Sequence, residues 1–124
     1  MSIVMIDTHI AVALYKGRLD VSRRAQRLLD TEVVRYSPMV ALELELLHEI
    51  GRAQVPAERV QAFLDEIGIV ESKEPLAAVV RQALTLRFTR DPFDRLIVAH
   101  AELLRAALVT RDSTLQAHYA GALG

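Results

Sequence analysis

The chain has 124 residues, enough for one domain that buries most of its apolar surface. Its 15 basic and 16 acidic residues give a formal net charge of −1, so no global positive field favours nucleic-acid binding. The sequence contains no cysteine, which excludes a disulfide framework, a zinc–thiolate site and a thiol nucleophile.

Short apolar runs alternate along the chain with longer segments of helical periodicity. The predicted strands are Ile3 to Ile6, Val33 to Tyr36, Ile67 to Val70, and Ala107 to Thr110. Helices are expected to begin near Thr8, Val21, Pro38, Pro56, Pro75, Pro92 and Ser113. Alternation of this kind predicts one α/β domain over residues 1–124, with a mostly parallel sheet of four to five strands covered by helices on both faces. The first apolar run is far too short for a signal peptide or a membrane span, so a cytoplasmic protein without membrane contact is expected.

Two aspartates follow predicted strands and precede predicted helices. Asp7 comes after the first strand and Asp112 after the last one. Because parallel strands end along one edge of a sheet, we expect both side chains to lie at that edge. Each aspartate is equally well explained, by itself, as the N-cap of the helix that follows it.

Glu43 and Asp94 interrupt apolar stripes of two predicted helices. Helical spacing groups Glu43 with Met39, Leu46, Leu47 and Ile50, on the face that is expected to be buried. Asp94 shares a stripe with Ile97, Ala101 and Leu104. A buried carboxylate costs several kcal/mol unless it is paired, protonated or bound to metal. The alternatives are an ion pair with arginine for Glu43 and, for Asp94, a favourable place in a first helical turn that Asp91 caps.

Four carboxylates that met at one edge would repel one another unless a cation lay among them. Oxygen ligands without histidine or cysteine suit a hard divalent ion such as Mg²⁺ or Mn²⁺. The sequence therefore predicts a metal site made by Asp7, Glu43, Asp94 and Asp112.

Four motifs occur in an order and spacing that resemble a known family. They are Met5-Ile6-Asp7-Thr8, Ser37-Pro38 leading to Glu43-Leu44, the run Asp91-Pro92-Phe93-Asp94-Arg95-Leu96-Ile97-Val98-Ala99-His100-Ala101, and Leu108-Val109-Thr110-Arg111-Asp112. On these motifs the chain resembles PIN-domain ribonucleases, in particular the VapC-type toxins of toxin–antitoxin pairs. Members of that family carry a further short strand after the last helix, and only residues 120–124 remain here to form it.

The resemblance implies that Asp7, Glu43, Asp94 and Asp112 are catalytic and bind Mg²⁺ or Mn²⁺, and that a metal-activated water hydrolyses RNA. It also implies a cognate antitoxin partner and, together with the hydrophobic fraction of 52%, a homodimer. One alternative is a PIN-like module that binds RNA or protein without cutting. A phosphotransferase with Asp7 as nucleophile is disfavoured, because His9 stands where a second acid would be needed and lysine is nearly absent. His9 could touch substrate, although a helix-face role is the favoured interpretation.

Overall fold

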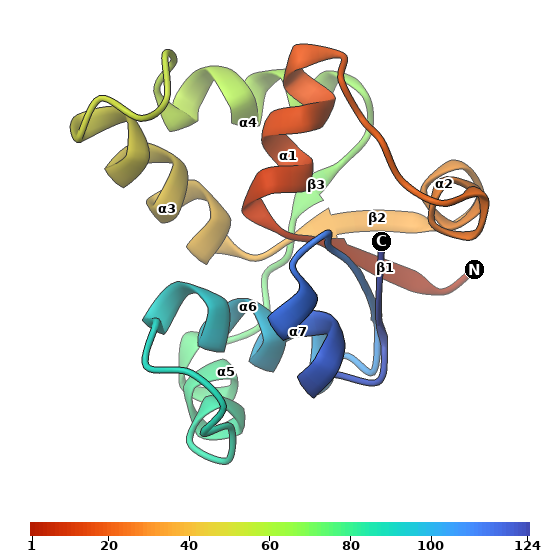
Figure 1. Ribbon diagram of the computed structural model, residues 1–124, viewed down its shortest axis with the longest axis vertical. Helices are drawn as coiled ribbons and strands as arrows, with labels where there is room; N and C mark the ends of the chain where they lie inside the picture. The colour runs from red at the N-terminus through yellow and green to blue at the C-terminus, as the bar shows by residue number, and fades with distance from the viewer.

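Strands and helices alternate along the chain as the sequence predicts (Figure 1). The computed structural model describes residues 1–124, and none of its helices has the length and apolar character needed to cross a bilayer. The strands are β1 Ile3–Ile6, β2 Val33–Tyr36, β3 Val70–Glu71, β4 Ala107–Val109 and β5 Ala122–Leu123. The helices are α1 Thr8–Lys16, α2 Arg23–Thr31, α3 Pro38–Glu49, α4 Ala57–Glu66, α5 Leu76–Ala83, α6 Pro92–Leu103 and α7 Ser113–His118.

The strands form one parallel sheet in the order β3-β2-β1-β4-β5. Helices α1, α3 and α4 lie on one face and α5, α6 and α7 on the other, while α2 lies beside the amino ends of β1 and β2 (Figure 1). This arrangement confirms the predicted α/β fold with both faces covered. Helix α3 also contacts α6, so helices from the two faces meet where β1 and β4 end.

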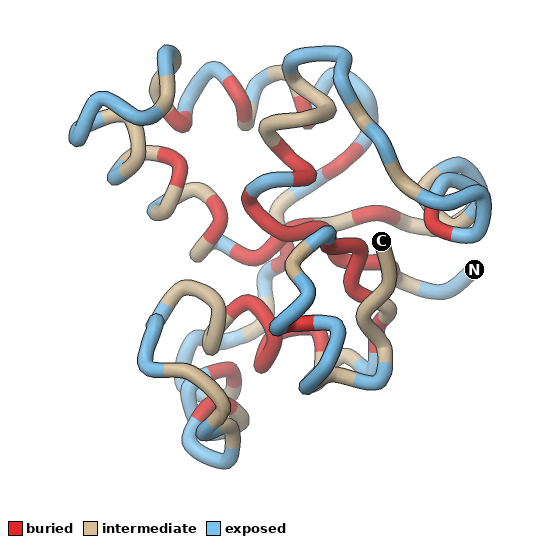
Figure 2. The backbone as a smooth tube through the Cα atoms, in the orientation of Figure 1, coloured by how far each residue is buried: buried red, intermediate tan, exposed pale blue.

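The central strand β1 is the most deeply buried element (Figure 2). Val4, Met5 and Ile6 are almost completely inaccessible, as expected for a parallel strand with neighbours on both sides and helices on both faces. Leu108 and Val109 of β4 pair with the end of β1 and are equally buried. The residues that follow these two strands are therefore held by the best-packed part of the molecule.

Several predicted element boundaries differ from the structure, and the fourth strand ends at Val109 and not at Thr110. The third strand is Val70–Glu71 and not residues 67–70, because Gly68, with a φ of +83°, ends the preceding helix. Its left-handed conformation suits glycine and cannot continue a strand. The second helix begins at Arg23 and not near Val21, because the Ser22 hydroxyl caps it by accepting a hydrogen bond from the Ala25 N–H.

The C-terminal strand that the family resemblance implies is present, although few residues remain to form it. The Leu108 N–H donates to the Gly121 carbonyl at 2.9 Å, and the Thr110 N–H donates to the Leu123 carbonyl at 2.9 Å. Strand β5 thus adds a fifth, parallel strand beside β4. Between α6 and β4 the chain turns at Arg105, whose φ of +51° makes it the one non-glycine residue in the left-handed region.

The expected inward stripe of α3 is wrong in part. Val40 and Leu44 form the buried face of this helix, while Leu46 and Ile50 are exposed. Glu43 lies between the two faces and is half-buried. The stripe predicted for Asp94 is correct, since Ile97 and Ala101 are buried.

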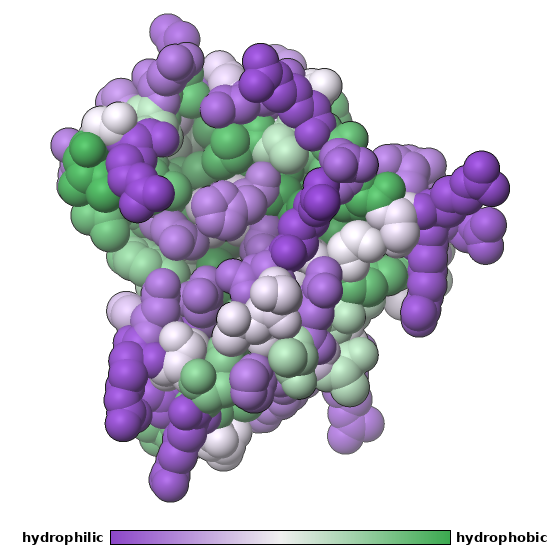
Figure 3. Space-filling model, viewed as in Figure 1, coloured by the Kyte–Doolittle hydropathy of each residue, from purple (hydrophilic) through white to green (hydrophobic).

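Two helices carry exposed apolar stripes. The side chains recur every four residues: Leu42, Leu46 and the C-cap residue Ile50 along α3, and Leu76, Val80 and the C-cap residue Leu84 along α5. Figure 3 shows hydrophobic side chains gathered over α3 at the left edge of the view. Leu42 and Leu76 line one hollow of about 270 Å³ between the two helices, so the stripes belong to one surface.

Candidate active site

Both strand-end aspartates cap the helices that follow them. One carboxylate oxygen of Asp7 accepts from the Ile10 N–H at 2.9 Å at the start of α1. In the same way, one oxygen of Asp112 accepts from the N–H groups of Thr114 and Leu115, at 2.8 and 3.1 Å, at the start of α7. The capping interpretation is therefore correct for both residues, and it does not exclude a shared site.

A buried threonine joins these two aspartates. Thr110, which follows β4 and has no exposed surface, donates its hydroxyl hydrogen to the second carboxylate oxygen of Asp7. The same hydroxyl oxygen accepts from the Asp112 backbone N–H at 3.0 Å. The Asp7 backbone N–H in turn donates to the Val109 carbonyl at 3.3 Å. Pairing of β1 with β4 thus fixes the backbone positions of Asp7 and Asp112 relative to each other.

Glu43 reaches this edge of the sheet from α3. The Thr8 hydroxyl, in the first turn of α1, donates to one carboxylate oxygen of Glu43. Because the second oxygen of Glu43 makes no hydrogen bond to the protein, it is available to a ligand.

Asp91 and Asp94 come from the start of α6. One oxygen of Asp91 accepts from the Phe93 N–H at 2.8 Å, so Asp91 is the N-cap, as predicted. The Asp94 backbone N–H approaches the same oxygen at 3.4 Å. The carboxylate of Asp94 accepts no hydrogen bond from the protein although it is half-buried.

These side chains line one hollow of about 110 Å³. Its lining consists of Asp7, Thr8, His9, Glu43, Asp91, Asp94, Ile97 and Asp112. All four predicted site residues are therefore brought together. Asp91 is a fifth carboxylate that the sequence interpretation assigned to capping alone. A hydrophilic band crosses this face of the molecule between α1 and α3 above and α6 and α7 below (Figure 3).

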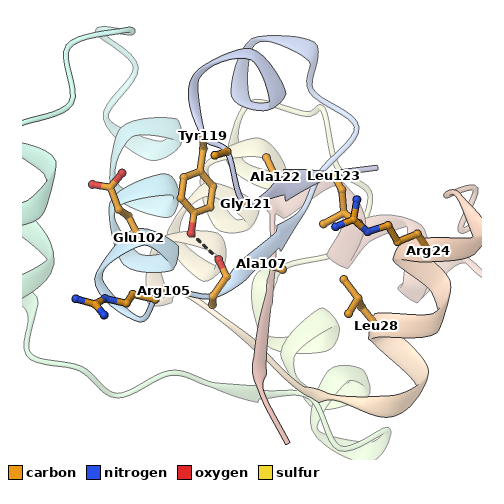
Figure 4. A pocket seen from close by; sticks show the side chains of 11 residues that line it. Arg24, Leu28, Glu102, Arg105, Ala107, Tyr119, Gly121, Ala122 and Leu123 are labelled. Carbon is orange, nitrogen blue, oxygen red and sulfur yellow. Dashed lines mark hydrogen bonds between the residues drawn. The ribbon is translucent and has the colours of Figure 1, made fainter.

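Larger hollows exist elsewhere, but their linings differ in kind. Figure 4 shows one of about 410 Å³ at the other end of β4, where the Tyr119 hydroxyl donates to the Ala106 carbonyl at 2.5 Å. Its lining consists mainly of apolar side chains, with Glu102 and Arg105 on one side and Arg24 on the opposite side. The acidic hollow stands out by its chemistry and not by its size.

Burial, together with the charges of neighbouring carboxylates, raises several pKa values in the acidic hollow. Burial, followed by the charges of neighbouring carboxylates, raises the pKa of Asp94 from 3.8 to about 6. Burial also raises the pKa of Asp7 and of Glu43, and the hydrogen bonds from Thr110 and Thr8 offset part of this effect. Asp94, whose carboxylate accepts no hydrogen bond, therefore has a pKa well above its usual value.

As the side chains lie, no three carboxylates or imidazoles are close enough together to hold a metal ion directly. The donor set nevertheless fits a hard divalent cation. It offers only oxygen ligands, several of them uncommitted, and Mg²⁺ keeps bound waters that can bridge to carboxylates. A cation among these groups would also relieve the repulsion that raises the pKa of Asp94.

Comparison with known proteins identifies the family of the chain. The family profile described as the PIN domain matches residues 4–121, and the chain belongs to this family. A comparison with curated protein sequences found no significant match.

Solved structures share the fold at low identity. A toxin–antitoxin complex from Klebsiella pneumoniae is 21% identical with a TM-score of 0.67, over 98% of this chain and 96% of that chain. VapBC2 from Rickettsia felis, bound to a DNA fragment from its promoter, is also 21% identical with a TM-score of 0.67, over 94% and 92%. FitAcB from Neisseria gonorrhoeae is 20% identical with a TM-score of 0.52, over 90% and 89%.

Proposed function

We propose that this protein is a Mg²⁺- or Mn²⁺-dependent endoribonuclease and the toxin of a toxin–antitoxin pair. The observation that carries the proposal is the convergence of five carboxylates, from β1, β4 and the helices α3 and α6, on one hollow at the carboxyl edge of the sheet. Membership of the PIN domain family supports a nuclease, and the names of the similar structures support a toxin.

In this proposal Asp7, Glu43, Asp94 and Asp112 hold the metal ion, directly or through water. When bound, the ion supplies Lewis acidity, which lowers the pKa of water and offsets charge that develops on the phosphoryl oxygens. The protein supplies position: Thr110 fixes the carboxylate of Asp7 and the backbone at Asp112. A carboxylate oxygen without a protein partner, on Asp94 or Glu43, orients the attacking water or accepts its proton.

The proposed partners are an RNA substrate, a cognate antitoxin and a second copy of the chain. The apolar stripes of α3 and α5 support the homodimer, because Leu42 and Leu76 leave 56% and 65% of their surface exposed beside a shared hollow. Exposed apolar surface of this regularity is typical of an interface. Sedimentation should show a dimer at micromolar concentration, and Leu42→Glu should shift it towards monomer. Ile67→Glu is the matched control, since Ile67 is an exposed apolar residue outside both stripes. A parent that sediments only as a monomer would contradict the dimer.

Cleavage of single-stranded RNA tests the enzymatic proposal. The purified chain should cut RNA with Mg²⁺ or Mn²⁺ and stop on addition of EDTA. Asp7→Asn and Asp94→Asn should abolish cleavage, because each removes a charge while keeping shape and, for Asp7, the capping oxygen. Asp30→Asn, an exposed aspartate on α2, is the control and should cut like the parent. If the parent binds RNA with metal present but leaves it intact, the non-catalytic alternative is correct instead.

A further inference from the structure

The acidic hollow contains one side chain of basic character, His9. It lies in the first turn of α1 and is exposed, and its ring makes no hydrogen bond to the protein. The other donors of the lining are committed, since the hydroxyl of Thr8 bonds to Glu43. His9 lines the hollow together with Asp7 and Glu43, which places it among the carboxylates.

Substrate binding poses an electrostatic problem in this hollow. Five carboxylates surround the place where an RNA phosphate, itself an anion, must lie. A single divalent cation offsets only part of that charge, so the substrate needs donors from the protein. A site that holds a phosphate ordinarily provides arginine, lysine or free backbone N–H groups for this purpose.

Three arginines are adjacent in sequence to the acidic residues, and none of them lines the hollow. Arg90, next to Asp91, is exposed, and the other two bond to groups elsewhere. Arg111, next to Asp112, bonds to the carbonyl and the carboxylate of Asp20, both at 2.9 Å. Arg95, next to Asp94, donates its Nε–H to the Ala83 carbonyl at 3.0 Å. His9 is thus the side chain in the lining that remains available to an anion.

Backbone groups beside His9 support the same conclusion. In the first turn of α1, Asp7 caps only the Ile10 N–H, and the N–H groups of Thr8 and His9 have no acceptor in the protein. N–H groups of a first helical turn point out of the N-terminal end of the helix, and Thr8 and His9 both line the carboxylate hollow at that end. Together with the ring of His9 they form a donor-rich corner on the α1 side of the site.

We propose that His9 is a substrate-binding residue, which donates a ring N–H hydrogen bond to a non-bridging phosphate oxygen of the RNA. This inference rests on the proposed ribonuclease function. It does not depend on a protonated ring, because a neutral imidazole also carries one N–H donor. The proposed role differs from the helix-face role that the sequence interpretation favoured for His9.

Binding of a labelled single-stranded oligoribonucleotide tests the proposal without turnover. The measurement uses Asp94→Asn as the uncleaving background, with Mn²⁺ present. Adding His9→Phe should weaken RNA binding about tenfold, the effect of losing one hydrogen bond to a charged group. Adding His9→Asn should retain most of the affinity, because the amide still donates. His118→Phe is the matched control, since this exposed histidine stacks on Phe88 outside the hollow.

Cleavage kinetics and metal binding separate the possible outcomes. In the active protein, His9→Phe should raise KM for RNA more than it lowers kcat, and calorimetry should show unchanged Mn²⁺ affinity. Weaker Mn²⁺ binding with unchanged RNA affinity would make His9 a metal ligand and overturn the proposal. RNA affinity within about twofold of the background would also overturn it while leaving the ribonuclease function intact. If the unmodified protein neither binds nor cuts RNA, both proposals fail together.

Discussion

Replacing Asp94 by asparagine should stabilise the metal-free protein at neutral and alkaline pH. The pKa of this carboxyl rises from 3.8 to about 6 in the fold. A carboxyl whose pKa is higher in the folded state binds its proton more tightly there, so its ionisation opposes folding. The parent should therefore lose stability as pH rises from about 4 to about 6, and the deficit should persist above that range. Asparagine is neutral throughout and avoids this loss.

The size of the effect follows from the position of Asp94. A shift of about two pKa units corresponds to at most roughly 3 kcal/mol. Asp94 is only half-buried, so solvent screens much of that energy. The charge also interacts favourably with the N-terminus of α6, by about 0.5 kcal/mol, and asparagine gives this up. We expect a net gain of about 1 kcal/mol, or about 4 °C in Tm for a chain of this length.

Thermal unfolding at two pH values, with and without metal, measures the prediction. In EDTA, Asp94→Asn should melt above the parent at pH 8 and close to it at pH 4, while Asp30→Asn should follow the parent at both. Metal at about 100-fold excess over its Kd should add roughly 2.7 kcal/mol to the parent and less to the variant. Equal melting temperatures at pH 8, combined with equal gains from metal, would refute the reasoning and leave Asp94 as a first-turn residue only.

Two further predictions concern stability. Thr110→Val should lower the free energy of unfolding by about 2 kcal/mol, because it leaves the buried oxygen of Asp7 without a donor and the Asp112 N–H without an acceptor. Thr110→Ser should restore most of this in urea titrations, and a valine variant as stable as the parent would contradict the assigned hydrogen bonds. Arg105→Gly should raise the free energy of unfolding by about 0.5 to 1 kcal/mol, because the φ of +51° suits glycine. Arg105→Ala should not gain this stability, because alanine keeps the Cβ that makes the left-handed region unfavourable. Equal stability of the glycine and alanine variants in the same titration would contradict the prediction.

The sequence predicts the centre of the fold better than its surface. Strand β1 and the aspartate after it could be identified because a buried parallel strand has an unbroken apolar run with a sharp polar end. The exposed stripe of α3 could not be distinguished from a core face, because Leu46 and Ile50 have the same periodicity whether they face the core or another subunit. The predicted third strand included Gly68, because a short apolar run does not show that its glycine ends a helix, and the start of β3 depends on pairing with β2.

Asp91 shows why one part of the site was missed. Its capping role is a complete local explanation, and the sequence offered no reason to seek another. Capping uses one oxygen of a carboxylate, however, and leaves its other oxygen and its charge available to the surroundings. Only the packing of α3 against α6 shows that this charge faces Glu43 and Asp94.

The use of Asp7, Asp91 and Asp112 as helix caps restricts how this site can change during evolution. A mutation to alanine at any of them removes a charge and also leaves the first turn of a helix uncapped, at about 1 kcal/mol each. Asparagine and serine remove the charge but still cap. Descendants that lost the proposed activity while keeping a stable fold should therefore carry asparagine or serine at these positions more often than alanine. A chain with such replacements would retain its shape, and with it any surface that a partner protein binds.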